Sequence, residues 1–209
     1  MPQDKICKTV HQYSRGPVSR EDMQKLLEVA EDYRKVKNYV YAHFGGIGSL
    51  SKLYPGYTVQ NEMTASGYRE TLGLPSVYFY LAVFDALGDI KSQWTRTKTK
   101  LTRQISRNEN LTEEEKHYLR FVIKVSNAFE AALNQKPVKL AGELQKQYEG
   151  LEAQVDGEKL RRYLCSRTRK AHVKLHTDAA EGFSIAERVY RYAGHGIYIY
   201  CKTAREVIL

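Results

Sequence analysis

Residues 75–107 read PSVYFYLAVFDALGDIKSQWTRTKTKLTRQISR, and this stretch decides the fold of the chain. Proline at position 75 favours the first turn of a helix, because it has no N–H to leave unpaired there. An unbroken helix would be about 48 Å long at ~1.5 Å per residue, with Gly88 as its weak point. Apolar residues recur at helical spacing, at Val77, Tyr80, Phe84, Leu87, Trp94, Leu101 and Ile105.

A second helix is predicted before this stretch. Ser19 followed by Asp22 forms a start similar to a capping box, in which side chains satisfy the free N–H groups of the first turn. Gly45 and Gly46 end this helix, since glycine readily adopts the conformation found at helix C-termini. Residues 45–74, rich in glycine and polar residues, read mainly as a loop.

A third helix is predicted after it. Thr112 and Glu115 form another capping box, and an apolar stripe then runs at helical spacing from Tyr118 to Leu133. A short amphipathic stretch follows around residues 144–151. These signals place the helices in the middle of the chain.

The period of the apolar residues changes to two from about residue 167. Residues 171–176 alternate between apolar and polar, and so do residues 197–202. Such alternation is typical of half-buried strands with one solvated face. With a further extended segment at residues 5–13, the sequence predicts an α+β fold with strands at both ends.

Composition favours a globular protein that binds polyanions. Thirty-three Lys and Arg residues face 24 Asp and Glu residues, so the 209-residue chain has a formal charge of +9. Such an excess favours nucleic acid first and anionic surfaces second. No apolar run approaches the ~20 residues that cross a bilayer, and the N-terminus lacks the apolar core of a signal peptide. Three cysteines without a C-x-x-C pair predict free thiols in a reducing cytoplasm, with no cofactor.

Residues 91–107 form a basic stretch without an acidic residue. Within it, cations spaced four, three and four residues apart share one helical face. Such a row neutralises successive phosphates of a strand and releases their counterions. Most charged helix faces are merely solvated, but the absence of acids favours phosphate contact here. The residues predicted to contact nucleic acid are Lys91, Arg96, Lys98, Lys100, Arg103 and Arg107.

A second basic cluster lies between residues 158 and 174, where Glu158 is the only acid. Part of it falls on the predicted strand, and basic residues beside tyrosines suit a groove that pairs phosphates and stacks bases. The alternative interpretation is an edge strand protected by charge. Tyrosines on the later strand are the best stacking candidates. The predicted contacts here are Arg161, Arg162, Arg167, Arg169, Lys170, His172, Lys174, Tyr198 and Tyr200.

Catalytic patterns are sparse. Residues 167–172, RTRKAH, match the R-x₄-H spacing of HEPN ribonucleases, so metal-independent RNA cleavage by Arg167 and His172 is an alternative function. That active site needs a helix, whereas the alternation at residues 171–176 favours a strand. Asp85 and Asp89, one turn apart, are interpreted as surface acids. The sequence predicts no catalytic site and no metal site.

The order of these segments resembles a known family. Residues 72–124, LGLPSVYFYLAVFDALGDIKSQWTRTKTKLTRQISRNENLTEEEKHYLRFVIK, are similar to the recognition-lobe helices of TnpB-like proteins, transposon-encoded RNA-guided nucleases related to type V CRISPR effectors. Residues 160–209 resemble the return of the chain into their wedge domain. The resemblance implies a partial wedge (OB-like) β-barrel interrupted by a helical recognition-type insert. It implies a first wedge strand in residues 1–17, a helical region in 18–155 and the return into the wedge in 156–209.

The resemblance also implies partners. In that family both regions grip the guide RNA and its heteroduplex with target DNA, and a following RuvC domain cleaves DNA with three metal-binding acids. None of those acids lies within these 209 residues, so the chain is expected to be a noncatalytic module that binds guide-type RNA or DNA. A decayed gene, half of a split system and an independent RNA-binding descendant all fit this expectation. A further alternative is an interaction protein that binds a separate RuvC-containing chain.

Overall fold

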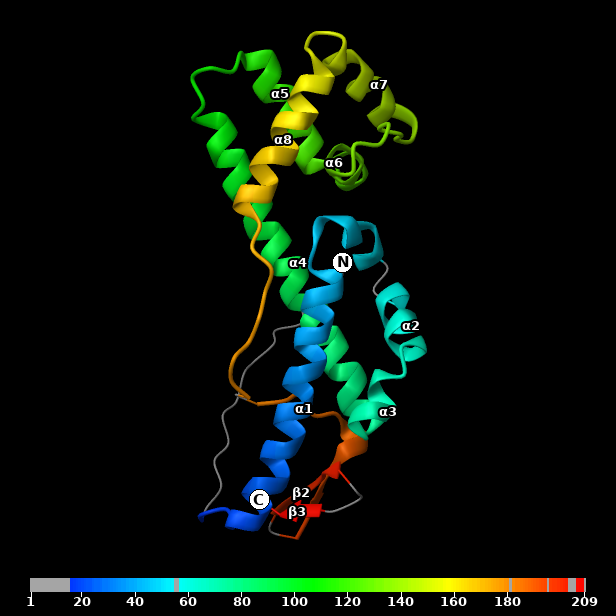
Figure 1. Ribbon diagram of the computed structural model, residues 1–209, viewed down its shortest axis with the longest axis vertical. Helices are drawn as coiled ribbons and strands as arrows, with labels where there is room; N and C mark the ends of the chain where they lie inside the picture. Colours follow the sequence, from blue (N-terminus) through cyan, green and yellow to red (C-terminus); the bar gives the residue numbers. More distant parts are fainter. Residues whose placement is uncertain (1–15, 55–56, 181, 195, 203–205, 209) are drawn as a thin grey trace, which may run out of the picture.

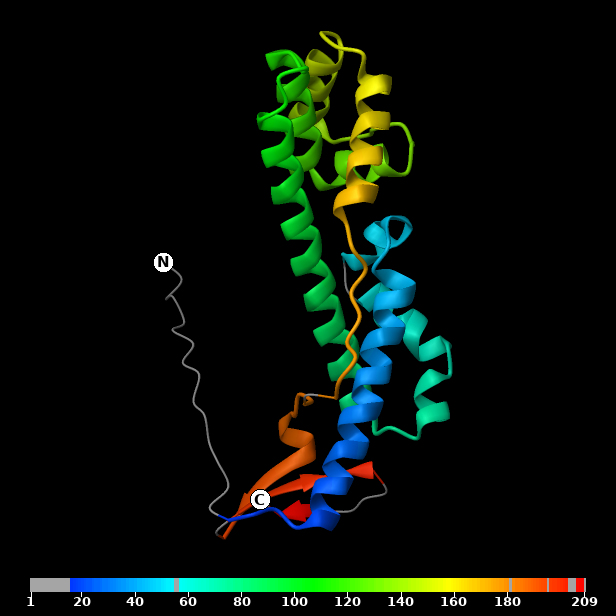
Figure 2. The same ribbon diagram turned by 60° about the vertical axis from the view of Figure 1, so that its left-hand side comes forward.

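The computed structural model describes residues 16–54, 57–180, 182–194, 196–202 and 206–208. Two long helices, α1 (Arg20–Phe44) and α4 (Ser76–Ser106), run side by side in the same direction along the long axis (Figure 1). The other elements are η1 (Ile47–Leu53), α2 (Tyr57–Ala65), α3 (Tyr68–Leu72), α5 (Glu113–Lys124), α6 (Ser126–Leu133), α7 (Gly142–Glu152), α8 (Gly157–Ala171), η2 (Glu187–Val189), β1 (Tyr190–Ala193), β2 (Gly196–Tyr200) and β3 (Glu206–Ile208). Helices α5–α8 gather at one end of the long pair and the strands at the other (Figures 1 and 2).

The predicted ends of the long helices are confirmed. Ser19 caps α1 by accepting a hydrogen bond of 3.0 Å from the N–H of Asp22, and Gly45 ends the helix. Pro75 is the residue directly before α4, one position earlier than the first-turn place expected for it. Helix α4 passes through Gly88 without a break. A side-chain cap therefore fixes the start of α1, whereas α4 has no side-chain cap among the described residues, and Gly45 ends α1 with a right-handed backbone instead of the left-handed one common for glycine there.

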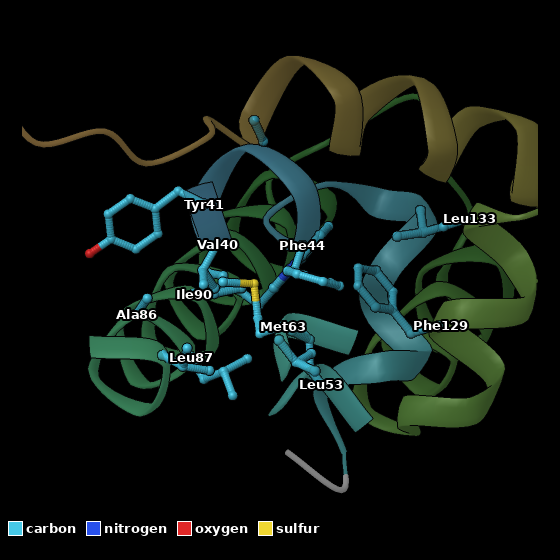
Figure 3. Close-up of a cluster of buried hydrophobic side chains, with 14 of the residues drawn as sticks. Val40, Tyr41, Phe44, Leu53, Met63, Ala86, Leu87, Ile90, Phe129 and Leu133 are labelled. Atoms are coloured by element: carbon cyan, nitrogen blue, oxygen red, sulfur yellow. The ribbon is translucent and has the colours of Figure 1, made fainter. Parts of the chain in front are cut away.

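The prediction of a loop over residues 45–74 is wrong. Helices η1, α2 and α3 occupy this segment, and they return the chain from the end of α1 to the start of α4. Leu53 of η1 and Val59 and Met63 of α2 are buried in the core with residues of the long helices, which stabilises these elements, because isolated helices this short are marginal in water. Figure 3 shows side chains from α1, η1, α2, α4 and α6 meeting in one core, among them Val40, Phe44, Leu53, Met63, Leu87, Ile90 and Phe129.

The capping box at Thr112 and Glu115 is confirmed, with both reciprocal hydrogen bonds present. The single helix expected from the stripe after it is wrong, because Val125 has an extended backbone and separates α5 from α6. Ser126 and Asn127 follow directly. Their side chains compete for backbone hydrogen bonds and favour helix ends over helix interiors, so a new helix begins there.

The strand predicted from about residue 167 through residue 176 is also wrong. Helix α8 continues to Ala171, and the chain from residue 172 then runs extended beside α1 and α4 without pairing with any described strand. The Asn38 amide replaces a strand partner: it accepts from the N–H of Thr177 at 2.9 Å and donates to its carbonyl at 2.8 Å. The alternation does not match the burial of this segment, because Val173 is 64% exposed whereas the polar His172 is packed against Trp94 and Gly45.

The described strands form an antiparallel sheet in the order β1-β2-β3, and β2 confirms most of the strand predicted at residues 197–202. Tyr78 of α4 donates a hydrogen bond of 2.7 Å to the carbonyl of Tyr200, which fixes this sheet to the long helices. The α+β class is confirmed in this coarse form, and the described residues form no barrel. The first strand expected in residues 1–17 lies outside the described residues for positions 1–15.

Candidate nucleic-acid interface

The C-terminal half of α4 and the residue directly after it, Arg107, carry four exposed cations on one side, defined here as the α4 basic face. Within the described ranges, none of their side chains forms a salt bridge or a hydrogen bond. At ~1.5 Å per residue the face extends about 16 Å along the helix axis. One strand of duplex DNA carries a phosphate about every 3.4 Å of axis, so the face matches about five of them. The residues are Arg96, Lys100, Arg103 and Arg107.

Arg96 lies near one carboxylate, that of Asp89 two turns earlier on α4. Burial alone would raise the pKa of Asp89, but hydrogen bonds from Tyr41 and Lys37 and the charges of Lys37 and Arg96 outweigh it, so this pKa is lowered. Lys37 Nζ lies 2.9 Å from the Asp89 carboxylate and is its direct ion partner. The guanidinium of Arg96 therefore lies near this carboxylate without forming a direct ion pair with it.

Lys91 and Lys98 lie on a different side of α4. At about 100° per residue, Lys98 is roughly 160° round the helix from Lys100. Lys91 Nζ lies 4.4 Å from the centroid of the Tyr54 ring, and Lys98 Nζ lies 4.8 Å from that of Phe129. Burial lowers the pKa of Lys98. The structure thus divides the six cations predicted to contact nucleic acid in residues 91–107 into two sets on different sides of the helix.

Arg161 was predicted to contact nucleic acid, but the structure places it in an internal cluster. Its Nη1 donates to Tyr148 Oη at 2.7 Å and to Tyr118 Oη at 3.2 Å, and it forms an ion pair with Glu152. Tyr148 donates to the same carboxylate at 2.6 Å. The guanidinium is therefore satisfied within the protein and serves to join α5, α7 and α8.

The other basic residues of α8 stay on the surface. Arg162 forms an exposed pair of 3.2 Å with Glu158, of the kind that contributes little to stability. Arg167 lies over the ring of Tyr163, 5.3 Å from its centroid. In the described part of the chain, the exposed side chains of Arg169 and Lys170 have no carboxylate within salt-bridge distance.

Two contacts join this end of α8 to α4. Asn108, just after α4, donates a hydrogen bond of 3.0 Å to Tyr163 Oη, and Thr97 Oγ1 lies 3.2 Å from His172 Nδ1. Thr97 is about 60° round the helix from Lys100, so the α4 basic face borders the side on which α8 lies. Sequence reasoning missed Tyr163, although its four-residue spacing from Arg167 is a helical signal.

His172 is held firmly in place. Its ring stacks on Trp94 with centroids 3.7 Å apart, and Nε2 lies 2.8 Å from the carbonyl oxygen of Gly45. With Nδ1 against Thr97, both ring nitrogens are engaged, and burial lowers the pKa of His172. Nothing in this geometry favours a joint catalytic role with Arg167, whose side chain lies over a tyrosine.

The remaining predicted contacts are also partly occupied. Lys174 Nζ lies 3.2 Å from the carbonyl oxygen of Ala42 on α1. The Arg191 guanidinium of β1 lies 4.1 Å from the centroid of the Tyr198 ring on β2, and Arg191 Nε donates to Tyr200 Oη at 3.0 Å. One face of Tyr198 is therefore covered, and strand β2 lies at the far end of the molecule from α8 (Figure 1).

Among the described residues, no group of three or more His, Cys, Asp or Glu side chains is placed to hold a metal ion. None of the described helices is long and apolar enough to cross a membrane. Comparison with protein-family models, with curated proteins and with solved structures found no match.

Proposed function

We propose that this chain binds a nucleic-acid strand through its phosphate backbone, along the α4 basic face. The observation that carries the proposal is the row Arg96, Lys100, Arg103 and Arg107, exposed on one side of a continuous helix and without salt bridges among the described residues. A rigid helix holds these four cations in fixed places over a length that about five phosphates of a strand span, so little ordering is needed on binding.

The exposed cations of α8 extend this surface. Tyr163 joins α8 to the end of α4, and Arg167 lies over the Tyr163 ring. Arg169 and Lys170 follow on the last turn of α8 and are exposed. A strand that runs along α4 would therefore meet further positive charge. Arg161 is left out of the proposal, because the internal cluster uses its donors.

The strand is proposed to be guide-type RNA or its heteroduplex with DNA. This finer proposal rests on the resemblance of residues 72–124 and 160–209 to TnpB-like proteins, in which a helical recognition insert and a wedge β-barrel grip those nucleic acids. The role proposed for these residues is to bind the strand. The helical middle and the small sheet support this layout only in outline.

The test compares two variants of the whole chain with equal loss of charge. In the first, Arg96, Lys100, Arg103 and Arg107 are all changed to Gln. The matched control changes Lys124, Lys136, Lys139 and Lys146, which are exposed at other places, to Gln. Fluorescence anisotropy would measure affinity for single-stranded RNA, duplex DNA and an RNA–DNA heteroduplex over a range of salt concentrations.

We expect the first variant to lose affinity and to show a shallower fall of log K with log salt concentration. Each lost phosphate contact reduces the magnitude of this slope by about 0.9 on duplex DNA and by about 0.7 on single strands. The control is expected to keep the slope of the wild type. Equal affinities and slopes for the two variants would show that only net charge matters and would remove α4 from the proposal.

A further inference from the structure

A separate pocket lies between η1, α4 and α6, on a different side of α4 from its basic face. Its volume is about 260 Å³, and its lining includes Tyr54, Lys91, Trp94, Lys98, Ser126 and Glu130. Sites for drug-sized ligands usually measure about 300–1,000 Å³, so this one suits a small group such as a phosphate ester.

Two lysines give the pocket its charge. Lys91 and Lys98 are seven residues apart on α4, which places them on the same side two turns from each other. In the portion of the chain that the structure describes, neither has a carboxylate within 4 Å, and each ammonium rests over an aromatic ring. Glu130 lines the pocket as well but pairs with neither. Two cations without counterions are thus brought to one small cavity.

The beginning of α6 adds hydrogen-bond donors. Ser126 and Asn127, the first two residues of this eight-residue helix, line the pocket, and no side chain caps its N-terminus. The first N–H groups of a helix have no partner within the helix, and with the helix dipole they favour an anion. This observation is independent of the lysines and points to the same kind of ligand.

Aromatic groups complete the wall. Tyr54 is 65% exposed, and the ammonium of Lys91 lies over one face of its ring, so a stacking partner would take the other face. Trp94 also lines the pocket, and its indole N–H is buried with no acceptor among the described residues. That nitrogen has almost no accessible surface, so Trp94 gives the pocket an aromatic wall and not a donor.

We propose that this pocket binds the phosphate monoester of a nucleotide. Lys91, Lys98 and the first amides of α6 would hold the phosphate oxygens, and Tyr54 would stack on the attached base. The same chemistry is offered by a free nucleoside monophosphate and by the 5′-phosphorylated end of a strand. The proposal is independent of strand binding along the α4 basic face, because it uses different side chains on another side of the helix.

The experiment uses the full chain and four probes: AMP, inorganic phosphate, and one single-stranded RNA carrying either a 5′-phosphate or a 5′-hydroxyl. Lys91→Met with Lys98→Met removes both charges and keeps the aliphatic stems. Lys124→Met with Lys139→Met, both exposed elsewhere, is the matched control. Calorimetry measures binding, and thermal unfolding checks that each variant is folded. Tyr54→Ala, at an exposed position, is a second test that does not depend on the lysine variant folding.

We expect at least one phosphate monoester to bind the wild type, with an affinity loss of about tenfold or more in the lysine variant and none in its control. Binding of AMP supports a free nucleotide as ligand. A preference for 5′-phosphate over 5′-hydroxyl RNA without AMP binding supports a strand end. Tyr54→Ala should weaken AMP or the 5′-phosphorylated RNA but not inorganic phosphate.

The proposal is overturned if AMP does not bind and the two RNAs bind equally, or if the lysine variant and its control behave alike. Strand binding is judged separately, from the α4 basic-face variant and the 5′-hydroxyl RNA. A chain that binds both RNAs equally through that face would therefore refute the pocket while supporting strand binding.

Discussion

Tyr41 of α1 donates a hydrogen bond of 2.5 Å to the carboxylate of Asp89 on α4, although 48 residues separate them in the sequence. The same pattern recurs two turns earlier on α1, where Tyr33 donates to Asp85. Ser184 donates to Asp85 as well, at 2.7 Å. The two carboxylates interpreted from the sequence as surface acids are therefore the polar joints between the long helices.

Removal of the Tyr41 hydroxyl tests one of these joints. Tyr41→Phe keeps the buried ring and should lower the free energy of unfolding by about 1.5–3 kcal/mol, the usual net value of a hydrogen bond to a charged group. Urea unfolding at pH 7, followed by circular dichroism, measures it. Tyr39→Phe on the same helix is the control, because the structure shows no hydrogen bond from its hydroxyl to another described residue. Equal losses in both variants would contradict the assignment.

The lowered pKa of Asp89 predicts a pH dependence. Its folded pKa lies below the value of 3.8 for an unperturbed Asp, so its ionised form stabilises the fold above pH 3.8. This contribution is lost as the pH falls through the folded pKa. Asp89→Asn should therefore be less stable than the wild type at pH 7, with the difference shrinking as the pH drops below 3.8. If the stability difference between the wild type and Asp89→Asn stayed the same below pH 3.8, the direction assigned to the Asp89 pKa shift would be wrong.

The lowered pKa of His172 predicts a second pH-dependent loss of stability, which occurs at a higher pH than the loss predicted for Asp89. Burial lowers it in the folded state below the ordinary value of 6.5, so the unfolded chain binds a proton first. Stability from the neutral ring is complete above pH 6.5 and falls as the pH drops from there to the folded pKa. His172→Phe keeps a ring to stack on Trp94 and should remove this slope. Unfolding free energies between pH 5 and pH 8 measure it.

Gly157 is the first residue of α8 and packs closely against Glu152. A Cβ added there would lie 2.5 Å from Glu152 Oε1, and that carboxylate is held by Arg161 and Tyr148. Gly157→Ala should therefore cost about 1–3 kcal/mol of stability, as overpacking usually does. Gly150→Ala, exposed within α7 with open space around it, should be neutral or gain up to about 1 kcal/mol.

Gly88 offers a stabilising change. It is exposed in the middle of α4, and a Cβ there would meet nothing within 4 Å. Gly88→Ala should raise the free energy of unfolding by about 0.5–1 kcal/mol, because alanine loses less backbone entropy in a helix. Thermal unfolding should show a higher midpoint. A lower midpoint would mean that α4 bends at this position in solution.

Features that depend on neighbouring residues could be predicted from the sequence. The caps at Ser19 and Thr112 and the length of α4 follow from side chains within one turn or on one helix. The strand proposed at residues 171–176 failed for a physical reason. The segment is extended but packs against the long helices, which cover His172 and leave Val173 64% exposed, so the apolar alternation does not mark its buried side.

The candidate sites depend more on contacts between distant residues. The α4 basic face could be predicted because its members share one helix. The internal position of Arg161 could not, since Tyr118 lies 43 residues before it and Glu152 belongs to another helix. The pocket that joins Tyr54, Lys91 and Ser126 could likewise not be predicted from any local sequence pattern.

The same direction of α1 and α4 has a kinetic consequence. Two such helices cannot be joined by a tight turn, so the chain travels back along the molecule before α4 begins, and again after α8. The contacts that hold the second return join residues far apart in the sequence, such as Tyr78 with Tyr200, 122 residues apart, and Arg34 with Thr177, 143 residues apart. Closing such long loops lowers the conformational entropy of the chain before the stabilising contacts form. This chain should therefore fold more slowly than a helical bundle of sequential hairpins.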